Sequence, residues 1–96
     1  MNIKEIYPRQ GKIDIELEIV SIDKQKEFER FGKKGRVATA IAKDDTGTIK
    51  LTLWNEEIDH VKPGDKIKIT NGYCGEFQGE KQLTAGRFGK LEVIKN

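Results

Sequence analysis

The sequence predicts a small all-β domain, a closed barrel of five strands with one short helix between the third and fourth strands. Ile and Val together number 16 of the 96 residues, against five Leu and four Ala, and β-branched side chains favour strands. In several segments apolar and polar residues alternate between turn-forming residues, which is typical of half-buried strands. With 34 apolar residues the chain can bury one modest core, so we expect a single domain over residues 1–96.

The first strand is expected over residues 12–20, where aliphatic and acidic side chains alternate. The aliphatic face comprises Ile13, Ile15, Leu17 and Ile19, and the acidic face comprises Asp14, Glu16 and Glu18. A polar stretch at 24–36, which ends in glycines, is expected to be a long loop. The alanine-rich segment 37–43 and the strand over 48–55 are then joined in a hairpin by the turn residues at 44–47.

The strand over residues 48–55 places its single tryptophan on the polar face. Ile49, Leu51 and Leu53 occupy the inward positions. Trp54 therefore points outward with Lys50 and Thr52, because successive strand residues face opposite sides.

One helical turn is expected at residues 56–61, ended by the Lys-Pro-Gly-Asp turn at 62–65. The fourth strand begins at residue 66 with Ile67 and Ile69 inward, and Asn-Gly at 71–72 breaks its alternation before Tyr73. The helix therefore separates the third and fourth strands.

The chain turns again through residues 75–81, a glycine-rich bend that contains Phe77. The last strand is expected over 82–94, interrupted at Gly86 and Gly89. It completes the set of five strands that a small barrel needs.

Composition and charge exclude several functional classes. The net charge is only +2, which excludes a uniformly basic nucleic-acid protein. Single copies of Cys74 and His60 form neither a disulfide nor a multi-ligand metal site, and no phosphate-binding glycine loop or catalytic triad pattern occurs. We therefore expect no enzyme, no cofactor, no metal and no small-molecule substrate. No apolar run reaches the ~18 residues of a membrane span, so no membrane association is expected.

Positive charge is concentrated in residues 24–36, where six basic side chains face two acidic ones. This net charge of +4 leaves −2 on the rest of the chain. A charge run is usually a solvated surface, but Phe28 and Phe31 are interleaved with the cations here. Aromatic rings beside cations are what a stacked base and its phosphate require.

Three further aromatic residues are candidate binding residues: Trp54, which the strand alternation places outside the core, and Tyr73 and Phe77, which flank a glycine-rich bend. They either cover loops and the barrel end or serve as platforms for bases, each stacked base contributing ~1–3 kcal/mol with little sequence preference. Single-stranded nucleic acid fits better than duplex, since no long basic helix is predicted. The acidic face of residues 12–20 is expected to repel phosphates.

Several short motifs occur in a fixed order, namely Asp-x-Thr-Gly at 44–47, Leu-Thr-Leu-Trp at 51–54, Pro-Gly-Asp at 63–65, Phe-x-Gly at 77–79 and Gln-Leu-Thr-Ala-Gly-Arg at 82–87. Together with Tyr73 they make most of the chain, residues 3–94, resemble the archaeal single-stranded-DNA-binding OB-fold proteins. That family includes the simple crenarchaeal SSB, the OB domains of archaeal replication protein A and the related human SSB of the SOSS complex. The resemblance implies a five-stranded OB-fold barrel.

The resemblance also implies which residues meet DNA. Base stacking is expected from Trp54, Tyr73, Phe77 and Phe28; backbone contacts are expected from Lys33, Lys34, Arg36, Lys50 and Arg87; Thr52 and Thr84 are expected to support the polar face. Some relatives carry an aromatic residue where Thr84 stands, so this chain has one stacking platform fewer. The sequence stops at Asn96, without the C-terminal tail of the simple SSBs. We therefore expect either a minimal SSB or one OB domain of a longer replication protein A chain, and we slightly favour the second.

The function expected from these residues is sequence-tolerant binding of single-stranded DNA in replication, recombination or repair. The expected partners are single-stranded DNA and other replication or repair proteins, in the cytoplasm with the nucleoid. Two alternatives remain open. In the first, the chain is an OB-fold domain for protein assembly in a replication protein A complex, and Trp54 contacts a partner protein. In the second, the chain binds single-stranded RNA through the same stacking, because stacking does not read the sugar.

Overall fold

The computed structural model describes residues 1–86 and 89–94. Their elements, in chain order, are η1 (Ile3–Glu5), β1 (Gln10–Ile22), β2 (Lys26–Arg30), β3 (Lys33–Asp44), β4 (Gly47–Trp54), α1 (Glu56–His60), β5 (Lys66–Phe77), β6 (Glu80–Thr84) and β7 (Lys90–Ile94). Neither η1 nor α1, the helices of this described part, is long and apolar enough to span a membrane.

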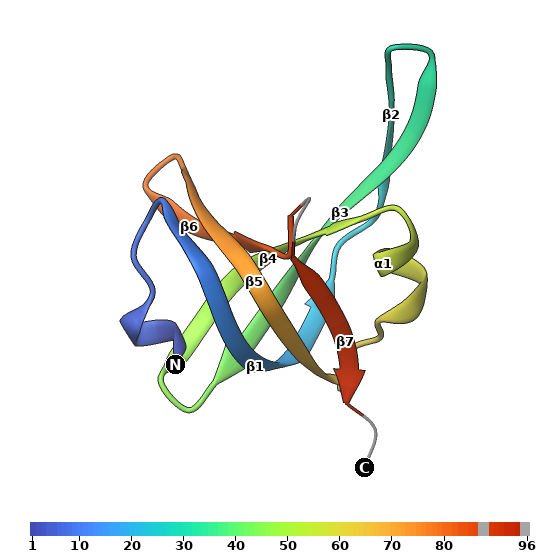
Figure 1. Cartoon of the computed structure of the whole chain (residues 1–96). Coiled ribbons are helices and arrows are strands. Elements are labelled where there is room, and N and C mark those ends of the chain that lie inside the picture. Colours follow the sequence, from blue (N-terminus) through green and yellow to red (C-terminus); the bar gives the residue numbers. More distant parts are fainter. Residues whose placement is uncertain (87–88, 95–96) are drawn as a thin grey trace.

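Five strands close the barrel in the order β1, β3, β4, β6 and β5, and pairing between β1 and β5 joins its edges (Figure 1). β4 and β6 are parallel, whereas the other pairs are antiparallel. β6 pairs with the second half of β5 and β7 pairs with the first half. The predicted last strand is therefore two strands, separated where the glycines interrupt the pattern. The predicted barrel class and the helix between β4 and β5 are confirmed.

The core consists of the inward-facing residues of each strand. β4 contributes Ile49, Leu51 and Leu53, as the alternation predicted, and β1 contributes four aliphatic residues. The alanine-rich segment in β3 also has an inner face, made of Ala38, Ala40 and Ala42, all buried. Small side chains on one strand opposite large ones on its neighbours fill a barrel interior efficiently.

The prediction of a long loop at residues 24–36 is wrong. β2 and the first part of β3 pair antiparallel in a hairpin that projects beyond the barrel (Figure 1). Its turn is two residues, Phe31 and Gly32, both with positive φ, between the paired residues Arg30 and Lys33. Both faces of this ribbon are largely polar, so no alternation of apolar and polar residues marks it as a pair of strands.

The Asp44 carboxylate is one of the groups that attach the N-terminal segment to the barrel. Asp44, at the end of β3, accepts hydrogen bonds from the Ile3 amide at 2.7 Å and from the Thr46 amide at 2.7 Å. Burial raises the pKa of Asp44, but the hydrogen bond from the Thr46 hydroxyl at 2.6 Å and the amide hydrogen bonds together outweigh burial, so the pKa is lowered. Ile3 and Ile6 are buried against the core, so η1 covers one side of the barrel.

Candidate nucleic-acid interface

The outward face of β3, β4, β6 and β5, here called the stacking face, carries the aromatic residues predicted as platforms. The strand register places Thr39, Thr52, Thr84 and Tyr73 side by side across these four strands. Directly opposed residues on neighbouring strands point to the same side of a sheet. Thr52 and Thr84 therefore lie in the middle of the face between Trp54 and Tyr73.

Phe28 of the hairpin meets Trp54 of β4 edge to face. Their ring centroids are 5.8 Å apart and their planes are 88° apart. The two residues lie on strands either side of β3, and the contact passes over Gly35, the cross-strand partner of Phe28. A Cβ at Gly35 would lie 2.4 Å from the Phe28 ring, so only glycine leaves room for this arrangement.

Trp54 is oriented by two hydrogen bonds. Its indole Nε1 donates to Oγ1 of Thr84 at 3.2 Å, and its backbone amide donates to Oε1 of Glu57 at 2.9 Å. Burial raises the pKa of Glu57, and the hydrogen bond from Trp54 opposes that shift. Thr84 thus fixes the neighbouring indole.

The four aromatic residues predicted to stack are all accessible. The exposed fraction is 36% for Phe28, 41% for Trp54, 46% for Tyr73 and 61% for Phe77. The Tyr73 ring lies within 4 Å of the positions that side chains at Gly11 and Gly75 would occupy. Phe77 ends β5 opposite Glu80. The structure therefore brings Phe28 and Trp54 together and places Tyr73 and Phe77 on the same face along β5.

The hairpin separates its charges by face. The front face, which includes Phe28 and continues into the stacking face through Val37, carries Lys26, Phe28 and Arg30 from β2 and Lys33, Gly35 and Val37 from β3. The back face carries Glu27, Glu29, Lys34 and Arg36. The front face therefore has three cations and no acid, whereas the back face has two of each sign. This follows because directly opposed residues share a side and consecutive residues do not.

The predicted backbone contacts consequently fall on different surfaces. Lys33 is on the front face, whereas Lys34 is on the back face opposite Glu29. Lys26 and Arg30 share the front face and were missed, because the segment was interpreted as a loop. A period of two in the charges, with Glu27 and Glu29 alternating with the cations, is the signal in the sequence that identifies them.

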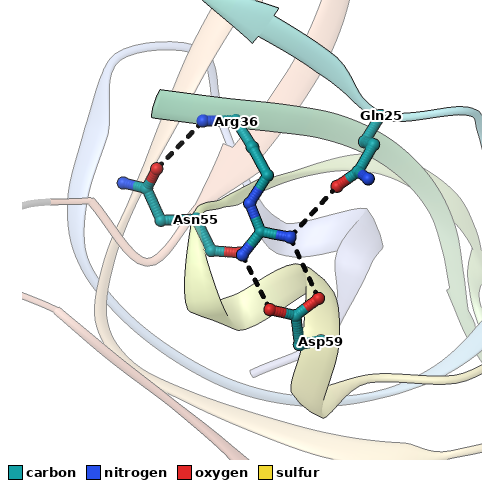
Figure 2. A network of polar contacts seen from close by, with 4 residues as sticks. All are labelled: Gln25, Arg36, Asn55 and Asp59. Atoms are coloured by element: carbon teal, nitrogen blue, oxygen red, sulfur yellow. Dashed lines mark hydrogen bonds and ion pairs between the residues drawn. The ribbon is translucent and has the colours of Figure 1, made fainter. Parts of the chain in front are cut away.

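Arg36 is held in a polar network at the base of the hairpin (Figure 2). Its guanidinium donates to both carboxylate oxygens of Asp59, at 2.7 and 3.1 Å, and to Gln25 at 3.3 Å. Its backbone amide donates to Oδ1 of Asn55 at 3.0 Å. Hydrogen bonding to Asp59 raises the pKa of Arg36 and lowers that of Asp59. A predicted phosphate contact is therefore paired with a carboxylate from α1.

The remaining predicted contacts differ in their surroundings. Lys50 lies on the stacking face and forms an ion pair with Glu80. Arg87 lies outside the described residues. In residues 1–86 and 89–94, no group of three or more His, Cys, Asp or Glu side chains is placed to hold a metal ion. Burial raises the pKa of the Cys74 thiol.

The acidic residues of β1 have lysines as neighbours on the same side of the sheet. Glu16 and Glu18 pair in register with Lys68 and Lys66 of β5, and Glu18 also lies 3.3 Å from the ammonium of Lys43. This side is therefore mixed in charge.

Comparison with known proteins identifies the family. The family model of single-stranded DNA binding protein Ssb-like, OB fold, matches residues 9–93. Ssb of Saccharolobus solfataricus is 26% identical over 89 residues, which cover 93% of this chain and 60% of that protein. Replication factor A of Methanothermobacter thermautotrophicus is 32% identical over 97 residues, which cover 95% of this chain and 12% of that protein.

A solved structure agrees with the same assignment. The crystal structure of a domain of replication protein A from Methanococcus maripaludis has a TM-score of 0.80 at 33% identity, covering 99% of this chain and 94% of that one. The resemblance noted from the motifs is thus confirmed. The chain belongs to the Ssb-like family of single-stranded DNA binding proteins, with an OB fold over the matched residues 9–93.

Proposed function

We propose that the chain binds single-stranded DNA with little sequence preference, through the stacking face and the hairpin front face together. The observation that carries this proposal is the continuity of the two surfaces. Four accessible aromatic rings lie on one side of the protein, and the cations of the hairpin share that side. Membership of a single-stranded DNA binding family supports the same substrate.

In this proposal the bases stack on Phe28, Trp54, Tyr73 and Phe77. Each stacked base contributes ~1–3 kcal/mol and every base has a ring face, so binding tolerates any sequence. The contact between Phe28 and Trp54 orients both rings before DNA arrives. Rings that are already oriented lose less conformational freedom on binding, which favours affinity.

The phosphates are proposed to meet Lys26, Arg30 and Lys33 on the front face of the hairpin. These cations have no acidic neighbour on that face. Lys50 at the other end of the stacking face can take part only by exchanging Glu80 for a phosphate. The hairpin is therefore the main electrostatic contact, and affinity should fall as salt rises.

The biological role proposed here is non-catalytic. Holding DNA unpaired serves replication, recombination or repair, and other proteins of those processes are the proposed partners. Names of relatives support replication in particular, since the relatives include a replication factor A and a replication protein A domain.

Fluorescence anisotropy of a labelled oligodeoxythymidine tests the proposal. The competitors are unlabelled oligodeoxythymidine, its ribose counterpart and a blunt duplex of equal length. The single-stranded DNA should compete with the highest affinity of the three. Preference for the ribose strand would assign the face to RNA. Absence of binding to all three at low salt would favour the assembly alternative, in which Trp54 meets a protein.

A further inference from the structure

The tip of the hairpin has a side chain that its own backbone disfavours. Phe31 adopts φ +53° at the first position of a two-residue turn, followed by Gly32 at +76°. Turns with two positive φ values favour Asn, Asp or Gly at the first position, and a bulky residue there is unusual. The turn between β5 and β6 has the same signs of φ with the polar residue Gln78.

The Phe31 side chain gains no packing in the folded protein that would offset this backbone strain. The Phe31 side chain is 96% exposed, the highest value among the large apolar residues that the structure describes. It buries almost no apolar surface, so it adds almost nothing to the stability of the hairpin. A strained and exposed aromatic residue is a reason to look for a ligand.

The neighbouring side chains indicate the chemistry of that ligand. Arg30 and Lys33 flank the turn as a cross-strand pair on the cationic front face. A ring beside two cations provides stacking for a base and neutralisation for its phosphate. Phe31 is three residues beyond Phe28, about 10 Å along the ribbon at ~3.3 Å per residue. That distance is about three nucleotides at the ~3.4 Å spacing of a stacked strand.

We infer that Phe31, with Arg30 and Lys33, forms a distal nucleotide subsite at the tip of the hairpin. It binds a base and phosphate of the same single strand, beyond the part that lies on the barrel. This inference rests on the proposed function and extends its footprint. It predicts that the tip contributes only when the strand is long enough to reach it.

The test compares Phe31→Asn and Phe31→Tyr with the wild-type chain. Asn suits the turn, so Phe31→Asn should melt at the same temperature or higher. Affinity is measured by anisotropy for oligodeoxythymidines of ~6 and ~16 nucleotides, within the range of one OB fold. Phe31→Asn should lose about fivefold or more for the longer strand, the low end of a stacking loss, and less than about twofold for the shorter one. Phe31→Tyr keeps the ring and should match the wild type.

Two results would overturn the inference while leaving the proposed function intact. One is a Phe31→Asn affinity for the longer strand equal to that of the wild type, while Trp54→Ala weakens it. The other is an equal loss at both lengths, which would indicate a general effect of the hairpin. Failure of the wild-type chain to bind either strand would instead overturn the proposed function, and the two failures are therefore distinguishable.

Discussion

The ring of Phe28 stands edge-on to the ring of Trp54, with centroids 5.8 Å apart, and it lies over Gly35, which has no side chain. This relationship joins an otherwise projecting hairpin to the barrel on the face that we propose for DNA. An aromatic pair of this geometry contributes about 0.5–1.5 kcal/mol beyond its buried area. The hairpin is thus positioned by a contact that belongs to the binding surface itself.

Gly35→Ala should weaken DNA binding without unfolding the barrel. The added Cβ would meet the Phe28 ring at 2.4 Å, so the ring must move away from Trp54. We expect a loss of about 1 kcal/mol or more in binding free energy, measured by anisotropy, from one displaced stacking ring. Gly75→Ala is the matched control on the same face, because its Cβ would lie an ordinary 3.8 Å from Tyr73. Equal affinities of the two variants would refute the role of Gly35.

Removing front-face cations should flatten the salt dependence of binding. Lys26→Gln with Lys33→Gln should lower the slope of log affinity against log salt by about 1.4, since each phosphate contact contributes ~0.7 on a single strand. Lys34→Gln, from the back face, is the control and should leave the slope unchanged. A slope lowered by ~0.7 for Lys34→Gln, the value expected for one phosphate contact, would contradict the separation of charges by face.

Arg36 should act by positioning the hairpin rather than by touching phosphate. Arg36→Gln and Asp59→Asn each remove the same ion pair, so both should increase hydrogen exchange of the β2 amides and reduce affinity. The salt slope should stay that of the wild type in both variants. A slope lowered by ~0.7 for Arg36→Gln alone would show that its charge reaches the DNA backbone instead.

Asp44 should make the fold sensitive to acid. Its pKa is lowered in the folded chain from the ordinary 3.8, so its stabilising effect is complete above that value and is lost as pH falls through the folded pKa. Asp44→Ala leaves the Ile3 amide without its acceptor and should cost about 1–3 kcal/mol at neutral pH. It should also reduce the acid dependence of the unfolding free energy, measured by urea denaturation.

The control for that experiment is Asp45→Ala at the next, exposed position of the same turn. It should leave both the neutral stability and its acid dependence close to those of the wild type. If both variants lose stability equally, the turn itself matters and the carboxylate of Asp44 does not.

The barrel and its outward tryptophan could be predicted because aliphatic residues alternate with polar ones in β4, in the middle of β1 and at the start of β5. Once Leu51 and Leu53 are inside, Trp54 must be outside. The exposure of Tyr73 and Phe77 depends on the break at Asn71-Gly72: the register shifts there, so the buried positions change from Ile67 and Ile69 to Cys74 and the two aromatic residues turn outward. These elements are specified by local sequence.

The hairpin could not be recognised in the same way. Every residue of β2 is exposed, and Phe28 packs across the ribbon on a glycine, so burial leaves no pattern in the sequence. The role of Arg36 depends on Asp59, which is 23 residues away on α1. Such a pairing arises from tertiary structure, and no local rule separates this arginine from the free cations around it.

The most direct test of the account is titration of Trp54 fluorescence with an unstructured oligodeoxythymidine at low and moderate salt, since this is the only tryptophan. Binding through Trp54 should quench its fluorescence strongly, and the quenching should weaken as salt rises. The variant Trp54→Ala should stay folded but lose ~1–3 kcal/mol of binding free energy. Unchanged fluorescence at low salt, with anisotropy also detecting no binding, would contradict the account and assign the aromatic face to a protein partner.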